Sequence, residues 1–208
     1  MVVFTTTIFF APYVQAKELY QEAIDWYTGR DGHPISIEKA RDCAIQLKAR
    51  KEIVGFCILG SIAQLEGKNK LAQDLYFEAF SSGDLIRYTE LEPDIGNFFL
   101  GEYYMVADPV DLKKANDHYR ISANLGFACS MASYGVNRLI GNGVPQNIYN
   151  AKEYLIEGMR KDSPQAYYNF AIYLLSIANE RKITAKAYLE YASYRGFKLA
   201  DQAINDWY

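Results

Sequence analysis

The sequence Ala151-Lys-Glu-Tyr-Leu-Ile-Glu-Gly158 decides the fold, because variants of it recur along the chain. In each copy an alanine is followed three or four positions later by a bulky or apolar residue, and seven positions later by a small or apolar one. These offsets lie on one face of an α-helix, so the pattern predicts an array of similar helices. The other copies occupy residues 40–47, 72–79, 115–122 and 185–192.

The spacing of the copies predicts one repeating unit. Their leading alanines are 32, 43, 36 and 34 residues apart. This spacing suits a unit of about 36 residues whose helices have a constant length and whose loops vary in length. The longest interval contains an insertion from Asp84 to Asp94, which we expect to be a solvated loop that includes Glu90 and Glu92. Glycines that can end a helix in the left-handed conformation follow three of the copies, at Gly83, Gly126 and Gly196.

A second helix is predicted before each copy from the second unit on, marked by a small residue in its middle. These residues are Gly60, Gly101, Gly135 and Ala171. Glycine inside a helix costs roughly 1 kcal/mol, so we expect it where two helices approach closely. No segment after residue 16 alternates with period two, so essentially no sheet is expected. The predicted helices span residues 17–28, 36–48, 53–65, 69–81, 95–106, 111–124, 128–140, 147–160, 165–178, 182–195 and, as a C-terminal cap, 198–208.

The loop of the fourth unit resembles a known repeat. Gly141-Asn-Gly143-Val-Pro145-Gln-Asn147, followed by Ala151, is similar to the Gly-x-Gly-Val-x-x-Asp loop of Sel1-like repeats. The Leu-Gly pair of that family's first helix occurs as Leu59-Gly60 and Leu100-Gly101. The resemblance implies an all-α, right-handed α-solenoid of about five Sel1-like, TPR-like helix pairs. It covers residues 17–208 as a single domain, although three units lack the Gly-x-Gly loop.

The first sixteen residues allow two interpretations. Residues 2–14 are apolar and aromatic, and Val14-Gln-Ala16 resembles the end of an export signal, which favours a periplasmic or secreted location. No Lys or Arg precedes Lys17, however, so the segment also suits an N-terminal cap on the first repeat of a cytoplasmic protein.

Composition excludes several classes of site. The net charge is −3 and no basic stripe is present, which argues against a nucleic-acid surface. No apolar run is long enough to span a bilayer. The cysteines Cys43, Cys57 and Cys129 form no metal-binding pattern, and a Cys43–Cys57 disulfide is an alternative to two buried thiols. His33 and His118 lie in different units, so we expect no metal, no cofactor and no catalytic residues.

We therefore expect the function to reside in a binding surface. Tyrosine is unusually frequent, with 18 copies, and is a candidate for such a surface. A contiguous exposed row of aromatic rings favours binding, whereas isolated rings suit helix seams. In such solenoids the first helix of each pair lines the concave side. We expect the positions two and four residues before the small marker to be exposed there and to bind a partner; these are Phe56, Ile58, Asn97, Phe99, Met131, Ser133, Tyr167 and Asn169.

The predicted function is a non-catalytic protein–protein interaction module, an adaptor, scaffold or inhibitor that acts as a monomer or weak homo-oligomer. The family resemblance also implies a more specific alternative, an immunity protein that neutralises a secreted toxin. A third hypothesis is an enzyme acting on cell-wall material, for which the sequence offers no nucleophile–base pair.

Overall fold

The computed structural model describes residues 11–177 and 181–208, and this part of the chain contains helices and no strand. A short 3-10 helix, η1 (Arg30–Gly32), follows the first α-helix. The α-helices are α1 (Ala11–Thr28), α2 (Ile37–Ala49), α3 (Ile53–Leu65), α4 (Asn69–Ser81), α5 (Asp84–Leu91), α6 (Pro93–Val106), α7 (Leu112–Asn124), α8 (Ala128–Ile140), α9 (Ile148–Arg160), α10 (Pro164–Ile177), α11 (Lys182–Tyr194) and α12 (Lys198–Trp207).

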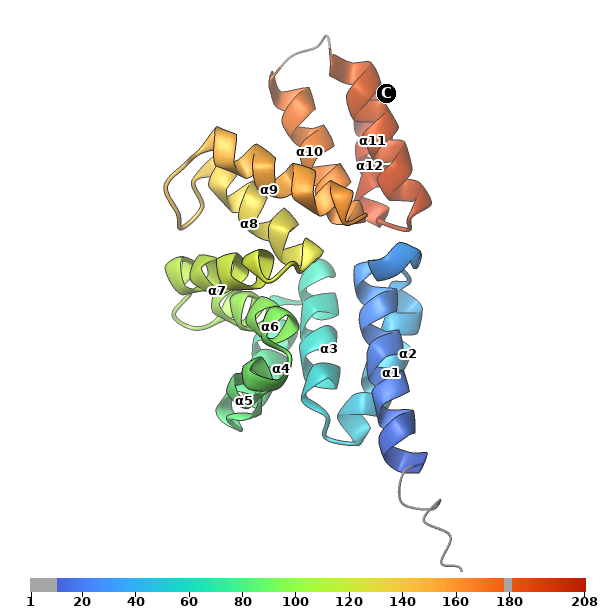
Figure 1. Cartoon of the computed structure of the whole chain (residues 1–208), viewed down its shortest axis with the longest axis vertical. Helices are drawn as coiled ribbons and strands as arrows, with labels where there is room; N and C mark the ends of the chain where they lie inside the picture. The colour runs from blue at the N-terminus through green and yellow to red at the C-terminus, as the bar shows by residue number, and fades with distance from the viewer. Residues whose placement is uncertain (1–10, 178–180) are drawn as a thin grey trace, which may run out of the picture.

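The helices form an α-solenoid of pairs, as the sequence predicts. We call the pairs α1–α2, α3–α4, α6–α7, α8–α9 and α10–α11 the first to fifth repeats; α12 packs on the last of them (Figure 1). The predicted boundaries agree with the observed ones to within a few residues, except at the N-terminus. There α1 begins at Ala11, so residues 11–16 are helical. The rest of the predicted export segment or cap, residues 1–10, lies outside the described residues.

The insertion of the longest interval forms a helix, and the prediction of a solvated loop is wrong. Gly83 adopts a left-handed conformation with φ of 78° and separates α4 from α5. The side chain of Leu85 is fully buried and anchors α5, while most of the helix faces solvent. Tyr88 on α5 also donates a hydrogen bond to the hydroxyl of Tyr20 on α1. The insertion is therefore a short amphipathic helix that packs chiefly on α6, also contacts α4, and reaches the first repeat through Tyr88.

The mid-helix glycines receive bulky side chains from the second helix of the same repeat. A Cβ added to Gly60 would lie 2.9 Å from the ring of Tyr76, and one added to Gly101 would lie 2.5 Å from the ring of Tyr119. Gly135 meets Leu155 in the same way, at 2.9 Å. The close approach predicted from the sequence is confirmed, because each of these bulky residues stands four positions after the alanine that starts its copy.

The cysteines of the described chain are free thiols, and all three are buried. The alternative of a Cys43–Cys57 disulfide is therefore not realised. Desolvation raises the pKa of Cys57 and raises that of Cys129 to about 12, which keeps both in the thiol form. Among the described helices, none has the length and apolar character to cross a membrane.

The array closes on itself, which the sequence analysis did not predict. The first and fifth repeats lie next to each other on the same side of the molecule (Figure 1). The backbone N–H of Ile35 donates to the carbonyl of Arg195 at 2.7 Å, joining the two ends of the solenoid. This closure leaves a narrow centre on which the starts of α6, α8 and α10 converge.

Candidate functional site

The predicted binding positions are mostly in the helix seams. Phe56, Ile58, Asn97, Phe99, Met131 and Ser133 have exposed fractions between 0 and 9%, so the expectation that they are exposed is wrong. Tyr167 and Asn169 are half-buried and remain accessible in part.

The reason is a shift of register around the helix axis. Tyr167, four positions before its marker, faces the second helix of its own repeat: its ring lies 4.5 Å from that of Tyr191 on α11. Asn169, two positions before the marker, faces the preceding repeat, since it donates to the carbonyl of Ala132 on α8 at 3.2 Å. The closed, narrow array leaves no wide concave groove for either set.

A contiguous row of half-buried aromatic rings runs across α4, α6 and α7 instead. Phe80 stacks on Tyr103 with ring centroids 4.3 Å apart, and Tyr103 meets Tyr104 edge-on at 5.0 Å. Tyr104 in turn stacks on His118 at 5.5 Å with the two rings nearly parallel. We call these four residues the aromatic row. It joins the second and third repeats.

Hydrogen bonds fix the far end of the row. The amide nitrogen of Asn97 donates to the carbonyl of Pro93 at 2.7 Å, which turns its oxygen toward His118. That oxygen lies 2.8 Å from Nδ1 of His118, so Nδ1 carries the proton and donates. Asn97, predicted as a contact residue, thus lies beneath the row and orients it.

Electrostatics keep the row neutral apart from one flanking cation. Desolvation lowers the pKa of His118 below its ordinary value, so the imidazole is neutral at pH 7 and its Nε2 is an acceptor. The Lys114 ammonium lies 5.2 Å from the centroid of the Tyr104 ring, a cation–π distance. Within the described residues, the hydroxyls of Tyr103 and Tyr104 have no hydrogen-bond partner. The row therefore presents aromatic edges and faces together with two free hydroxyls.

A polar cluster of buried and half-buried side chains lies between α3, α4, α6 and α7. Glu102 accepts a hydrogen bond of 2.6 Å from the Tyr119 hydroxyl, and Ser61 on α3 is bonded to Tyr76. Desolvation raises the pKa of Glu102 to about 7 against an ordinary value of 4.5, partly offset by the bond from Tyr119. The pKa of Tyr76 is raised by desolvation as well. These groups are bonded to one another, which suits a structural role.

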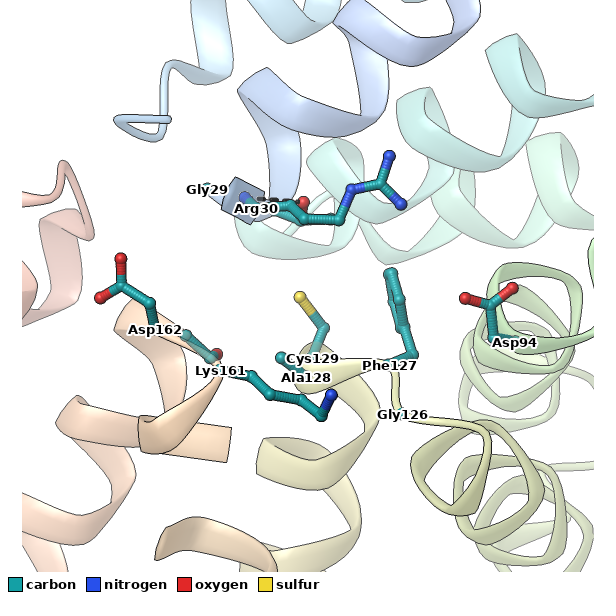
Figure 2. Close-up of a pocket in the computed structure, with 11 residues that line it drawn as sticks. Gly29, Arg30, Asp94, Gly126, Phe127, Ala128, Cys129, Lys161 and Asp162 are labelled. Carbon is teal, nitrogen blue, oxygen red and sulfur yellow. Dashed lines mark hydrogen bonds between the residues drawn. The ribbon is translucent and has the colours of Figure 1, made fainter. Parts of the chain in front are cut away.

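The structure also contains a central cavity of about 250 Å³ (Figure 2). Its wall comes from the end of α1 (Thr28 to Arg30), Asp94 on α6, the start of α8 (Gly126 to Cys129) and the segment from Lys161 to Ser163. Both charge signs are present, and among the described residues no group of three His, Cys, Asp or Glu could hold a metal ion. The thiol of Cys129 at its wall stays protonated, because desolvation raises its pKa to about 12.

The high tyrosine content indicated either helix seams or a row of aromatic rings, without locating such a row. The adjacent pair Tyr103-Tyr104 lies in a row of ring contacts. The pair lies after the small marker Gly101 in α6. The predicted binding positions lie before the marker, so they did not include this pair.

Comparisons with known proteins concern the fold. No protein-family model matches the sequence, and no curated protein matches it. A Sel1 repeat protein from Oxalobacter formigenes is similar in structure, with a TM-score of 0.44 and 17% identity over 83% of this chain and 50% of that one. The protein c5321, described as a protective antigen of uropathogenic Escherichia coli with an SLR fold, has a TM-score of 0.48 and 16% identity over 91% of this chain and 48% of that one.

The chain spans about half the length of these two structures. Its repeated alanines, its mid-helix glycines and its loop at residues 141–147 are the features that resemble Sel1-like repeats in the sequence. The five helix pairs of the described residues give those features a common structural role. The chain is an α-solenoid of helix pairs whose sequence features resemble those of Sel1-like repeats.

Proposed function

We propose that this protein is a non-catalytic binding module that holds a partner protein on the aromatic row. The observation that carries the proposal is the contiguous stack from Phe80 to His118, half-exposed and with two unbonded tyrosine hydroxyls. Tyrosine is enriched in protein interfaces because it buries a large ring and offers a hydroxyl at a low entropic cost. The partner that fits is a protein segment with an apolar or planar side chain and hydrogen-bond acceptors nearby.

Photo-crosslinking tests the location without depending on a loss of binding. Tyr104 is replaced by the photoreactive benzoylphenylalanine, and the same replacement at Tyr194 is the matched control. Tyr194 is a tyrosine of the fifth repeat with an exposed fraction of 81%, and it belongs to no ring cluster. We expect one protein to be crosslinked in stoichiometric amounts from position 104 and not from position 194. Equal crosslinking from both positions would remove the row as the binding surface.

The identity of that partner separates the roles that the sequence left open. A secreted toxin supports the immunity role, and a component of a larger assembly supports an adaptor or scaffold. The surface around Tyr167 and Asn169 remains a second proposed contact, because both side chains are partly accessible. Crosslinking from position 167 measures its contribution in the same experiment.

A further inference from the structure

Most of the hydrogen bonds between the two ends of the solenoid are made by one arginine. Arg195, at the end of α11, has an exposed fraction of 5%. Its Nη2 donates to the carbonyl of Gly29 at 2.8 Å and to that of His33 at 2.9 Å. Its Nη1 donates to the carboxylate of Asp162, and the backbone carbonyl of Arg195 accepts from Ile35. We call these contacts the clasp.

The clasp contains backbone groups that approach very closely. A Cβ added to Gly196 would lie 2.3 Å from the carbonyl oxygen of Ile35, and one added to Gly29 would lie 3.3 Å from the ring of Pro164. The two surfaces therefore fit each other closely in the closed ring. Apart from these few atoms, the hydrophobic clusters of the described residues do not join the ends: the fifth repeat has a core of its own, separate from the core that includes Ala23 and Ile24 of α1.

Closure leaves two polar atoms buried without a partner, one on each side of the clasp. Nε of Arg195 and Nδ1 of His33 are both inaccessible to solvent and have no hydrogen bond among the described residues. A buried donor of a charged group that lacks an acceptor destabilises the state that buries it. Opening the clasp would hydrate both atoms, whereas it would expose little apolar surface.

We infer that the ring opens and closes at this clasp while the five repeats stay folded. Consecutive helices pack on each other along the whole array, and Leu139 of α8 packs against the core of the fifth repeat, whereas the two ends, as far as the structure describes them, meet only through the few atoms of the clasp. The clasp is therefore the weakest junction of the array. Gly29 and Asp162 line the central cavity as well as the clasp, so opening also gives access to the cavity. The opening is a conformational device of the array and is independent of the aromatic row.

Native-state hydrogen exchange of two neighbouring amides tests this inference on the isolated chain. The amide of Ile35 is bonded across the clasp, whereas that of Ser36 is bonded within the first repeat, to the carbonyl of Trp26 at 2.8 Å. If the clasp opens alone, the Ile35 amide exchanges at least tenfold faster than the Ser36 amide after correction for intrinsic rates. Equal rates for the two amides overturn the inference.

The variant Arg195→Ala tests the clasp in a second experiment, and Arg41→Ala is its control. Arg41 is a more exposed arginine that pairs with Glu66 between the first and second repeats. In Arg195→Ala we expect a further tenfold rise in the exchange of Ile35, with Ser36 and the helical circular dichroism unchanged. Arg41→Ala should leave both amides unchanged. An unchanged Ile35 rate in Arg195→Ala overturns the role of the clasp, and if that variant does not fold, the wild-type ratio decides.

Discussion

The Tyr119 ring packs directly on Gly101 while its hydroxyl donates to the carboxyl group of Glu102, the next residue along α6. One side chain of α7 thus makes both the apolar contact with Gly101 and the polar contact with Glu102 inside the third repeat. Gly101 and Glu102 directly precede Tyr103 and Tyr104 in the same turn of α6, so these contacts also hold the part of the helix that carries the two tyrosines. The aromatic row depends on this contact for its orientation.

Substitution Gly101→Ala should destabilise the protein by about 1–3 kcal/mol, because the new methyl group meets a ring that cannot move without breaking its bond to Glu102. Chemical denaturation measures the change. In a Tyr119→Leu background the ring is absent, so the same substitution should be neutral or stabilising through the higher helix propensity of alanine. An equal loss in both backgrounds would contradict the packing described for Gly101.

Substitution Glu102→Gln should make stability less dependent on pH. The pKa of Glu102 is raised to about 7 in the folded protein from 4.5, so the folded state favours the neutral carboxyl group. Below pH 4.5 the carboxyl group is neutral in both states and the two proteins should differ little. From there to about pH 7 the wild type loses stability relative to the variant, because only its unfolded state releases the proton.

At pH 8 the Glu102→Gln variant should be more stable by roughly 1–3 kcal/mol, a range that allows for partial contact of the side chain with solvent. Unfolding at pH 4 and pH 8 provides the comparison. A difference of the same size at both pH values would show that Glu102 does not titrate as described.

Substitution Leu85→Ala should remove the anchor of α5 and cost about 2–4 kcal/mol. Leu91, in the same helix, has an exposed fraction of 72% and serves as the control. Leu91→Ala should change stability by less than about 0.5 kcal/mol. Equal small effects would mean that α5 contributes nothing to the fold.

Substitution Lys51→Gly should stabilise the protein by about 0.5–1 kcal/mol. Lys51 has a φ of 61°, a left-handed conformation that suits glycine better than lysine. Arg120, which is exposed in the interior of α7, is the control: Arg120→Gly should be destabilising by about 1 kcal/mol. Thermal unfolding of the two variants should therefore move in opposite directions.

Local patterns predicted the repeats well because each repeat is stabilised by contacts between residues close in sequence. Gly60 and Tyr76, or Gly135 and Leu155, are such pairs, and their periodicity is visible without a structure. Helix α5 was missed because eight residues with one buried leucine give a weak periodic signal. The partner of Arg195 could not be predicted at all, since Gly29 is 166 residues away and no local pattern marks a buried guanidinium.

The sequence predicted that the candidate site contains aromatic residues, but it placed the site on the wrong residues. The tyrosine content indicated aromatic surfaces, but a rotation about the helix axis separates the buried Phe99 from the half-exposed Tyr103. The sequence determines that one face of a helix is apolar, whereas the packing of neighbouring helices determines how much of that face is covered.

The most direct test of the central claim is calorimetric titration of the crosslinked partner into wild type, Tyr104→Glu and Tyr194→Glu. The account predicts a loss of affinity of about thirtyfold or more for Tyr104→Glu, the size expected for an aromatic residue at the centre of an interface, with Tyr194→Glu equal to wild type. Unchanged affinity of a folded Tyr104→Glu variant would contradict the claim that the aromatic row binds the partner.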